Sequence, residues 1–316
     1  IVSSGKQRSI NEQDIAASVV EPLMNVLQAL GEKGLTHRAV RATNLFFGDP
    51  EGGKVILGDC ASGPPGYDQP LVYETTARMA ADPAGRGVGT LSDDLYALGM
   101  TLAELAIGRR PLANMTDQEI MDIKLSKGSF QAIASQEKLP LIMIEPVRGL
   151  LCDDPEERWG FAELHAWLDG RRTKPVQGNT EKRAARSQNI SGKDYYTVRA
   201  LAQGVAKNWV NALTPLRDGT VEIWLRRGLG DNDRAKAMAD AMRQLQWAGA
   251  DKRSAEEVLV ARSILILDPS GPVRYKGFSA MVDGFGNMLS YDVQHGSGPQ
   301  RFSDVIVRDI PAFWFG

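Results

Sequence analysis

The chain has 316 residues, of which 43% are hydrophobic and 24% are charged, the proportions of an ordinary folded protein. Its 37 basic and 39 acidic residues give a net charge of −2, so no overall charge draws it to nucleic acid or to an acidic membrane. At about 150 residues per domain, this length favours two domains.

Cysteine and histidine are scarce in this sequence. The two cysteines, Cys60 and Cys152, do not make a disulfide framework and fit a reducing compartment. Three histidines beside so few cysteines disfavour a structural zinc site. No stretch approaches the ~20 apolar residues of a membrane span, and no signal-peptide pattern opens the chain. We expect a cytoplasmic location, and a piece of a longer protein because the first residue is Ile1.

The first predicted helix covers residues 12–32. Its apolar residues recur at spacings of three and four, which places them on one face. They are Ile15, Val19, Leu23, Val26, Leu27 and Leu30. Ser9 or Asn11 is expected to cap the start, and Gly31 to mark the end. The short apolar run at 55–57 then predicts a strand.

Helices dominate the next hundred residues. Prolines and glycines make most of the stretch 62–91 a loop. Leucines spaced by three and four predict a helix over 94–105. A Thr-x-x-Glu capping box at 116–119 precedes another helix, and two more are expected at about 144–151 and 161–168.

The stretch from Thr36 to Leu45 contains the strongest chemical pattern. His37, Arg38 and Asn44 stand at the spacing of His-Arg-Asp-Leu-x-x-x-Asn, the catalytic loop of protein kinases. Further along, the chain has an Asp after the predicted strand, then Ser-Asp-x-Leu-Tyr-x-Leu-Gly and Asp-Pro-x-x-Arg. Each motif alone is weak, but their order and spacing together are specific.

This order resembles the C-terminal lobe of eukaryotic-like Ser/Thr protein kinases over about residues 9–170. The resemblance implies that Asn44 and Asp59 are the family's cofactor-binding and metal-binding residues, which hold Mg²⁺ on the nucleotide. It places Arg41 where the family usually has a phosphate-contacting Lys. It also implies that Asp94 holds the catalytic-loop backbone. Asn and Asp are equally common as turn residues, and an exposed Arg is commonly only solvated.

The residues that carry chemistry in that family are substituted here. Ala39 stands at the Asp that accepts the substrate proton, and a methyl group accepts none. Cys60 and Ala61 replace the Phe and Gly of Asp-Phe-Gly, and Ala84 replaces the Glu of Ala-Pro-Glu. Arg158 matches the Arg that pairs with that Glu in the family, so the sequence does not indicate which residue Arg158 contacts here.

A working kinase also needs a Gly-rich loop and a strand Lys, and neither motif precedes the first helix. We therefore expect residues 1–172 to be a degenerate kinase C-lobe, a pseudokinase whose N-lobe is absent from this fragment. Its degenerate catalytic loop, His37, Arg38, Ala39 and Asn44, would hold a fold rather than transfer a phosphate.

The rest of the chain predicts a linker and a second small helical domain. Residues 173–193 are polar and basic, a linker pattern, and residues 194–316 form the second domain. Its helices are expected at about 197–213, 221–228, 231–247, 254–267 and 277–289. Ser254 and Glu257 would form a capping box for the fourth. No family and no catalytic set is recognised there. The fold class is therefore mostly α, with a short β element in the first domain.

Two functions stay open at this point. The first is a catalytically inactive pseudokinase that serves as a signalling scaffold or protein-interaction platform, with a protein partner, no nucleic acid and no cofactor. The alternative is an atypical nucleotide-dependent kinase or transferase whose N-lobe lies outside the fragment, with ATP and Mg²⁺ at Asn44 and Asp59.

A further hypothesis concerns phosphorylation of the 60–90 segment. Its candidate sites are Ser62, Tyr73, Thr75 and Thr76. Arg38 would receive the phosphate by a charge-assisted pair.

Overall fold

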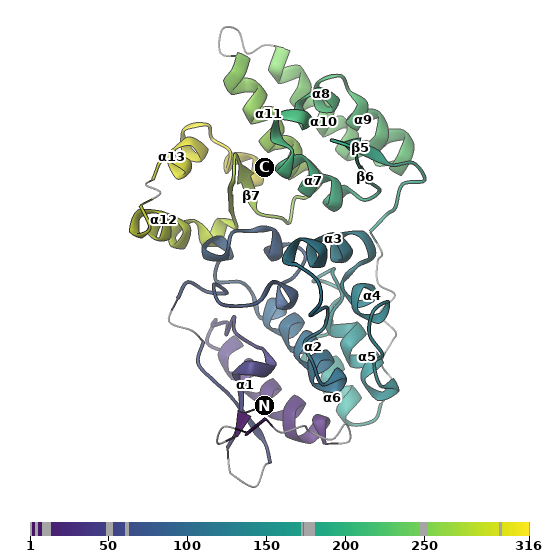
Figure 1. The fold of residues 1–316 in the computed structure, drawn as a ribbon, viewed down its shortest axis with the longest axis vertical. Coiled ribbons are helices and arrows are strands. Elements are labelled where there is room, and N and C mark those ends of the chain that lie inside the picture. Colours follow the sequence, from purple (N-terminus) through teal and green to yellow (C-terminus); the bar gives the residue numbers. More distant parts are fainter. Residues whose placement is uncertain are drawn as a thin grey trace. The chain divides into compact units, whose positions relative to one another are not determined.

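The computed structural model is mostly helical, as the sequence predicts (Figure 1). It describes residues 2–3, 6–7, 14–48, 53–60, 63–171, 173, 181–246, 252–296 and 299–315. The chain forms two compact units. The first unit comprises residues 1–79 and 88–179, and the second unit comprises residues 80–87 and 180–316. The chain thus contributes a short internal segment to the second unit long before the rest of that unit begins.

The first unit opens with a small sheet and one helix. A π-helical turn, Ala16–Val20, continues into α1 (Glu21–Gly31), which confirms the described part of the predicted 12–32 helix. Ser9 and Asn11, the proposed caps, lie outside the described residues. The sheet has the order β2-β1-β3-β4. Its strands are β1 (Val2–Ser3), β2 (Lys6–Gln7), β3 (Leu45–Phe47) and β4 (Val55–Leu57). Only β4 was predicted from the sequence.

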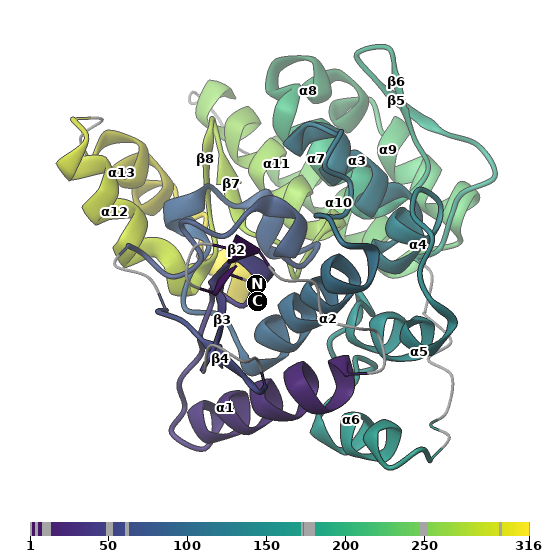
Figure 2. The ribbon, with the colours of Figure 1, turned by 60° about the horizontal axis from the view of Figure 1, so that its bottom comes forward.

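Five α-helices follow in the first unit (Figure 2). They are α2 (Leu91–Ile107), α3 (Asp117–Lys127), α4 (Ser129–Ala134), α5 (Leu141–Leu150) and α6 (Phe161–Leu168). The predicted Thr116–Glu119 capping box is present, because the Thr116 amide donates to the Glu119 carboxylate and the Glu119 amide donates to the Thr116 hydroxyl. A second capping box, between Thr90 and Asp93, starts α2 three residues before the predicted 94–105 helix.

The core of the first unit is centred on α2, nearly all of whose N-terminal two-thirds is buried. Helix α5 packs against it. A Cβ atom added to Gly99 would lie 2.6 Å from the Leu150 Cβ, so glycine at this position lets the two helices approach closely. Leu98, Leu102 and Leu150 are fully buried at this contact region.

The second unit contains two hairpins besides its helices. The strands are β5 (Gln188–Ile190), β6 (Lys193–Tyr195), β7 (Val273–Tyr275) and β8 (Phe278–Ala280). The helices are α7 (Val198–Lys207), α8 (Trp209–Arg217), α9 (Thr220–Ile223), α10 (Asn232–Gln246), α11 (Lys252–Leu267), α12 (Phe285–Gln294), α13 (Gln300–Val307) and α14 (Ala312–Phe315). Side chains of α7 and α11, including Leu201, Val205 and Ile264, are buried in its core.

Two predictions about the start of the second unit are wrong. The linker was expected to reach residue 193, but Ala184 is buried and Gln188–Ile190 forms β5. The helix expected over 197–213 is interrupted at Asn208, whose φ of −111° and ψ of 46° are not helical. Thr197 does cap α7, since its hydroxyl accepts the Ala200 amide.

Two later predictions also need correction. Ser254 lies inside α11 rather than at its cap, because that helix already begins at Lys252. The first part of the predicted 277–289 helix is a hairpin turn and a strand. Lys276 and Gly277 both have positive φ, 46° and 84°, the conformation of a two-residue hairpin turn that joins β7 to β8.

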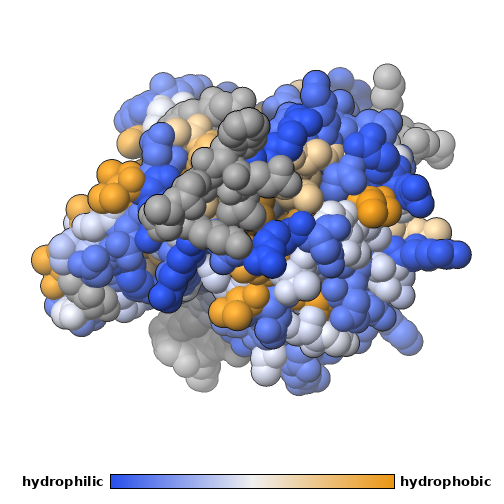
Figure 3. Space-filling view, turned by 90° about the horizontal axis from the view of Figure 1, so that it is seen from above, coloured by the Kyte–Doolittle hydropathy of each residue, from blue (hydrophilic) through white to orange (hydrophobic). Residues whose placement is uncertain are grey.

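No helix in the described part of the chain has the length and hydropathy that a membrane crossing requires. The face drawn in Figure 3 is mainly hydrophilic, with separate small hydrophobic patches. Scattered apolar residues of this kind are normal on folded proteins.

Helix α5 offers a matched test of the core. Leu150 is fully buried, whereas Leu141 is 88% exposed. Leu150→Ala should lower the free energy of unfolding by about 2–5 kcal/mol, because it leaves a cavity beneath α2. Leu141→Ala should change it by less than about 0.5 kcal/mol. Urea unfolding of both variants measures this, and equal effects would contradict the packing described.

Candidate functional site

The loop 36–45 is held by a buried carboxylate at the start of α2. Asp94 is fully buried, and its two oxygens accept the backbone amides of His37 at 2.6 Å and Arg38 at 2.8 Å. Burial raises the pKa of Asp94, although both amide bonds and the Arg38 charge oppose the shift. The bracing contact expected for Asp94 is therefore present. It fixes the backbone immediately before position 39.

His37 and Arg38 point in different directions from this braced backbone. The His37 Nε2 lies 2.9 Å from the Gly58 carbonyl oxygen, which ties the loop to the end of β4. Arg38 has a φ of 58°, an unfavourable value for a non-glycine residue, and its side chain is buried. Its Nη2 donates to the Glu74 carboxylate at 2.9 Å. The His37 side chain thus connects the loop to Gly58, and the Arg38 side chain connects it to Glu74.

Position 39 offers no acid or base. Ala39 is 2% exposed, and its side chain is a methyl group. Its carbonyl oxygen accepts the Asn44 Nδ2 at 3.0 Å. Cys60, at the Phe position of Asp-Phe-Gly, is exposed, and Ala61 lies outside the described residues. The loop therefore keeps its shape around a residue that cannot accept a proton.

Asn44 and Asp59 are brought together, as their matching to the kinase motifs implies. The Asn44 Nδ2 donates both to Ala39 O and to the Asp59 backbone oxygen, the latter at 2.8 Å. An amide nitrogen has two protons, so both are used on backbone carbonyls. A Cβ atom on Gly58 would overlap the Asn44 Oδ1, so glycine is required there. The amide of Asn44 is thus built into the loop.

An Mg²⁺ ion fits this pair only in part. The Asn44 Oδ1 and the carboxylate of the exposed Asp59 could each supply an oxygen ligand, and Mg²⁺ takes its other ligands from phosphates and water. Within the described residues, no group of three or more His, Cys, Asp or Glu side chains could hold a metal ion. Asn44 and Asp59 are therefore the residues that would hold Mg²⁺ if a nucleotide binds.

Arg41, matched to the phosphate-contacting position, is bound by protein atoms. Its Nη1 donates to the Asp68 carbonyl at 2.8 Å and contacts the Gln69 Oε1 at 3.3 Å. Gln69 in turn donates to the Val40 carbonyl. Arg41 thus connects the loop 36–45 to residues 68–69.

A buried charge network surrounds the same loop, and sequence reasoning missed most of it. Glu74 is fully buried against Arg38, and Arg78 donates to Asp93 at 2.8 Å. The Lys124 ammonium, 1% exposed, donates to the carbonyls of Val72 and Glu74. These partners are 15–52 residues apart in sequence, so no local pattern indicates the pairs.

This network contradicts the phosphorylation hypothesis at three of its four sites. Tyr73, Thr75 and Thr76 are 3%, 5% and 4% exposed. The Tyr73 hydroxyl donates to Glu104, and the Thr75 hydroxyl donates to Asp93. Arg38 is already paired with Glu74. The fourth site, Ser62, lies outside the described residues.

Arg158 finds partners without the missing Glu. Its Nε donates to the Cys152 carbonyl at 2.8 Å, and its Nη1 donates to the Ser92 carbonyl and hydroxyl at 2.9 Å. Its guanidinium also lies over the Tyr96 ring, 5.2 Å from the centroid. The Cys152 carbonyl, after α5, and the carbonyl and hydroxyl of Ser92, at the start of α2, therefore take the place of the carboxylate.

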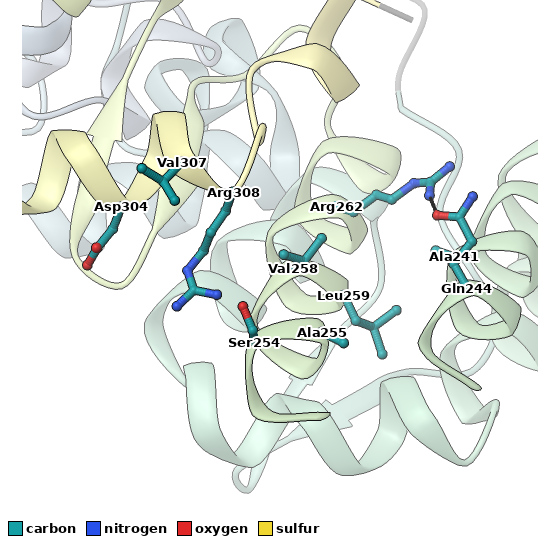
Figure 4. A pocket seen from close by; sticks show the side chains of 10 residues that line it. All are labelled: Ala241, Gln244, Ser254, Ala255, Val258, Leu259, Arg262, Asp304, Val307 and Arg308. Carbon is teal, nitrogen blue, oxygen red and sulfur yellow. Dashed lines mark hydrogen bonds between the residues drawn. The ribbon is translucent and has the colours of Figure 1, made fainter. Parts of the chain in front are cut away.

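A separate cavity of about 610 Å³ lies in the second unit, between α10, α11 and α13 (Figure 4). Its lining combines an apolar floor from α11 with polar side chains at the edges. It consists of Ala241, Gln244, Ser254, Ala255, Val258, Leu259, Arg262, Asp304, Val307 and Arg308. Arg262 is hydrogen-bonded to Gln244 and stacks over the Phe313 ring. None of the predicted site residues lines this cavity.

Comparison with known proteins finds distant similarity for part of this chain. No family model matches the chain. It is similar to a probable myosin light chain kinase of Dictyostelium discoideum, with 25% identity over 170 residues. The match covers 52% of this chain and 34% of the relative, so the chain spans about a third of that protein's length. The similarity indicates a protein-kinase-like relationship.

The bracing role of Asp94 predicts a large stability effect. Asp94→Ala leaves the buried His37 and Arg38 amides without acceptors and should cost about 2–5 kcal/mol. Asp59→Ala removes an exposed carboxylate and should cost less than about 0.5 kcal/mol. Chemical denaturation compares the two variants. If both lose the same stability, Asp94 does not hold the loop.

The Arg78–Asp93 pair predicts a dependence on pH. Burial alone would raise the pKa of Asp93, but Arg78 and Arg38 outweigh it and lower the pKa below 3.8. The carboxylate's stabilisation is therefore fully present above pH 3.8 and is lost as pH falls towards the lower folded pKa.

The measurement is the difference in unfolding free energy between the natural chain and Asp93→Asn. This difference should shrink between about pH 7 and about pH 2.5. The raised pKa of Asp94 acts in the opposite direction, but it is common to both proteins and cancels. A difference that does not change with pH would refute the ion-pair argument.

Proposed function

We propose that this chain is a catalytically inactive pseudokinase module that acts as a signalling scaffold or protein-interaction platform. The observation that carries the proposal is Ala39, a buried methyl group at the position of the proton-accepting Asp, in a loop whose backbone is still braced by Asp94. Loss of a general base lowers a rate by about 10²–10⁴-fold. The distant similarity to a kinase supports the kinase-like frame of the proposal.

The use of the polar side chains gives further support. Arg38, Arg41 and Asn44 each donate hydrogen bonds to acceptors within the protein. A site for phosphate transfer needs donors aimed at the substrate's developing charge. Because these donors hold loops together instead, the arrangement favours a structural use of the motif and a protein partner that reads the resulting surface.

The alternative, an atypical nucleotide-dependent kinase or transferase, rests on a different observation. The Asn44 amide donates to the Asp59 backbone oxygen and the Asp59 side chain is exposed, which supports these two neighbouring residues as oxygen ligands to Mg²⁺. Phosphoryl transfer depends mainly on positioning and charge stabilisation, and a protein without the base retains those contributions. ATP and Mg²⁺ are the cofactors that this alternative requires.

One experiment separates the two functions. The purified protein is heated with and without ATP–Mg²⁺, and phosphate transfer from radiolabelled ATP to a general acceptor protein is measured in parallel. We expect no thermal shift and no transfer above background. At a concentration 100 times its dissociation constant, a nucleotide would stabilise the fold by about 2.7 kcal/mol, which is readily detected.

Asp59→Ala is the matched control. Phosphate transfer that occurs in the natural chain and disappears in Asp59→Ala would establish the enzyme and overturn the pseudokinase proposal. A thermal shift without transfer would show nucleotide binding but no catalysis. A signal that persists unchanged in Asp59→Ala would come from elsewhere, such as a contaminating kinase.

A further inference from the structure

Residues 80–87 belong to the second unit, although their neighbours in sequence on both sides belong to the first. The segment runs through two short 3₁₀ turns, Arg78–Ala80 and Pro83–Gly85. Its flanks are anchored in the first unit, by the Arg78–Asp93 pair before it and by the bond from the Thr36 hydroxyl to Val88 O after it. The second unit therefore determines how the stretch between these two anchors is held.

Three hydrogen bonds connect the segment to the end of the β7–β8 hairpin. The Asp82 amide donates to Ser279 O at 2.8 Å, and the Ser279 hydroxyl donates to Ala80 O at 2.6 Å. The Met281 amide donates to Gly85 O at 2.8 Å. Strand β8 and the residue that follows it thus bind the backbone of the segment.

Contact between the two backbones is closer than side chains would allow. A Cβ on Gly284 would overlap the Gly85 carbonyl and lie 2.9 Å from the Gly87 nitrogen. A Cβ on Gly85 would lie 2.8 Å from the Ala280 Cβ and from Ser279 O. Ala81 and Ala84 of the segment are 6% and 2% exposed, so their small side chains are also buried within the second unit.

We infer that residues 278–284 of the second unit form a peptide-binding surface whose occupant is the segment 80–87 of the same chain. The surface holds this turn-rich segment through backbone hydrogen bonds and the close contact between Gly85 and Gly284. Release of the segment would free the stretch between Met79 and Val88 without unfolding either unit. This interaction does not depend on whether the protein transfers phosphate.

Hydrogen exchange of the whole chain tests this inference. Gly284→Ala should displace the segment, and exchange of the Asp82, Gly85 and Met281 amides should become faster by about tenfold or more. Gly284 has a φ of −100° and a ψ of −3°, values open to alanine, so backbone strain is not the cause. Gly286→Ala is the control, because its Cβ would meet nothing within 4 Å.

Ser279→Ala provides a second variant, since it removes only the hydroxyl bond to Ala80 O and leaves the packing intact. It should speed exchange within 80–87 by a smaller factor, with the rest of the chain unchanged. The inference is overturned if the 80–87 amides exchange as fast as an unfolded peptide in the natural chain. It is equally overturned if Gly284→Ala and Gly286→Ala give the same exchange rates there.

A competition measurement tests the surface as a receptor. Gly85→Val should vacate it, because the added atoms meet Ala280 and Ser279. A fluorescent peptide with the sequence of residues 78–89 should then bind the Gly85→Val chain more tightly than the natural chain. Adding Gly284→Ala to Gly85→Val should abolish that binding. If the peptide binds both chains equally, or neither, residues 278–284 are not a peptide receptor.

Discussion

The Asp94 carboxylate is the constraint on which the kinase-like loop depends. It is fully buried and accepts two backbone amides from a loop more than fifty residues away in sequence. A buried carboxylate is costly unless such donors compensate it. Because both donors come from consecutive residues, the loop has one orientation, and the positions of Ala39 and Asn44 follow from it.

The polar residues around this loop are held by contacts within the protein. Asn44 uses both amide protons on backbone carbonyls, and Arg38 is neutralised by Glu74 in a fully buried pair. Removing either partner of such a pair leaves an uncompensated buried charge, which is strongly destabilising. These residues therefore contribute to stability whether or not a phosphate is transferred.

Sequence reasoning succeeded where the physical signal is local. Helical periodicity predicted α6 with its observed bounds, and the capping box at 116–119 marked the start of α3. It failed at both hairpins of the second unit, whose turns are Ser191-Gly192 and Lys276-Gly277. Their first residues adopt positive φ without the Asn or Asp that usually indicates such a turn. The Arg38–Glu74 pair was invisible for another reason, because only the folded core brings the two residues together.

The segment 80–87 was mispredicted for both reasons: its local sequence is misleading, and its contacts are made by residues distant in sequence. Its one proline and two glycines indicate a loop, yet Ala84 is 2% exposed within the second unit. In the kinase motif a Glu stands at this position, and here a Glu would bury a carboxylate among small residues. Its family partner, Arg158, is engaged by the carbonyls of Cys152 and Ser92. The alanine and the rearranged arginine are therefore mutually consistent: once the segment packs in the second unit, a charge at position 84 costs more than it contributes.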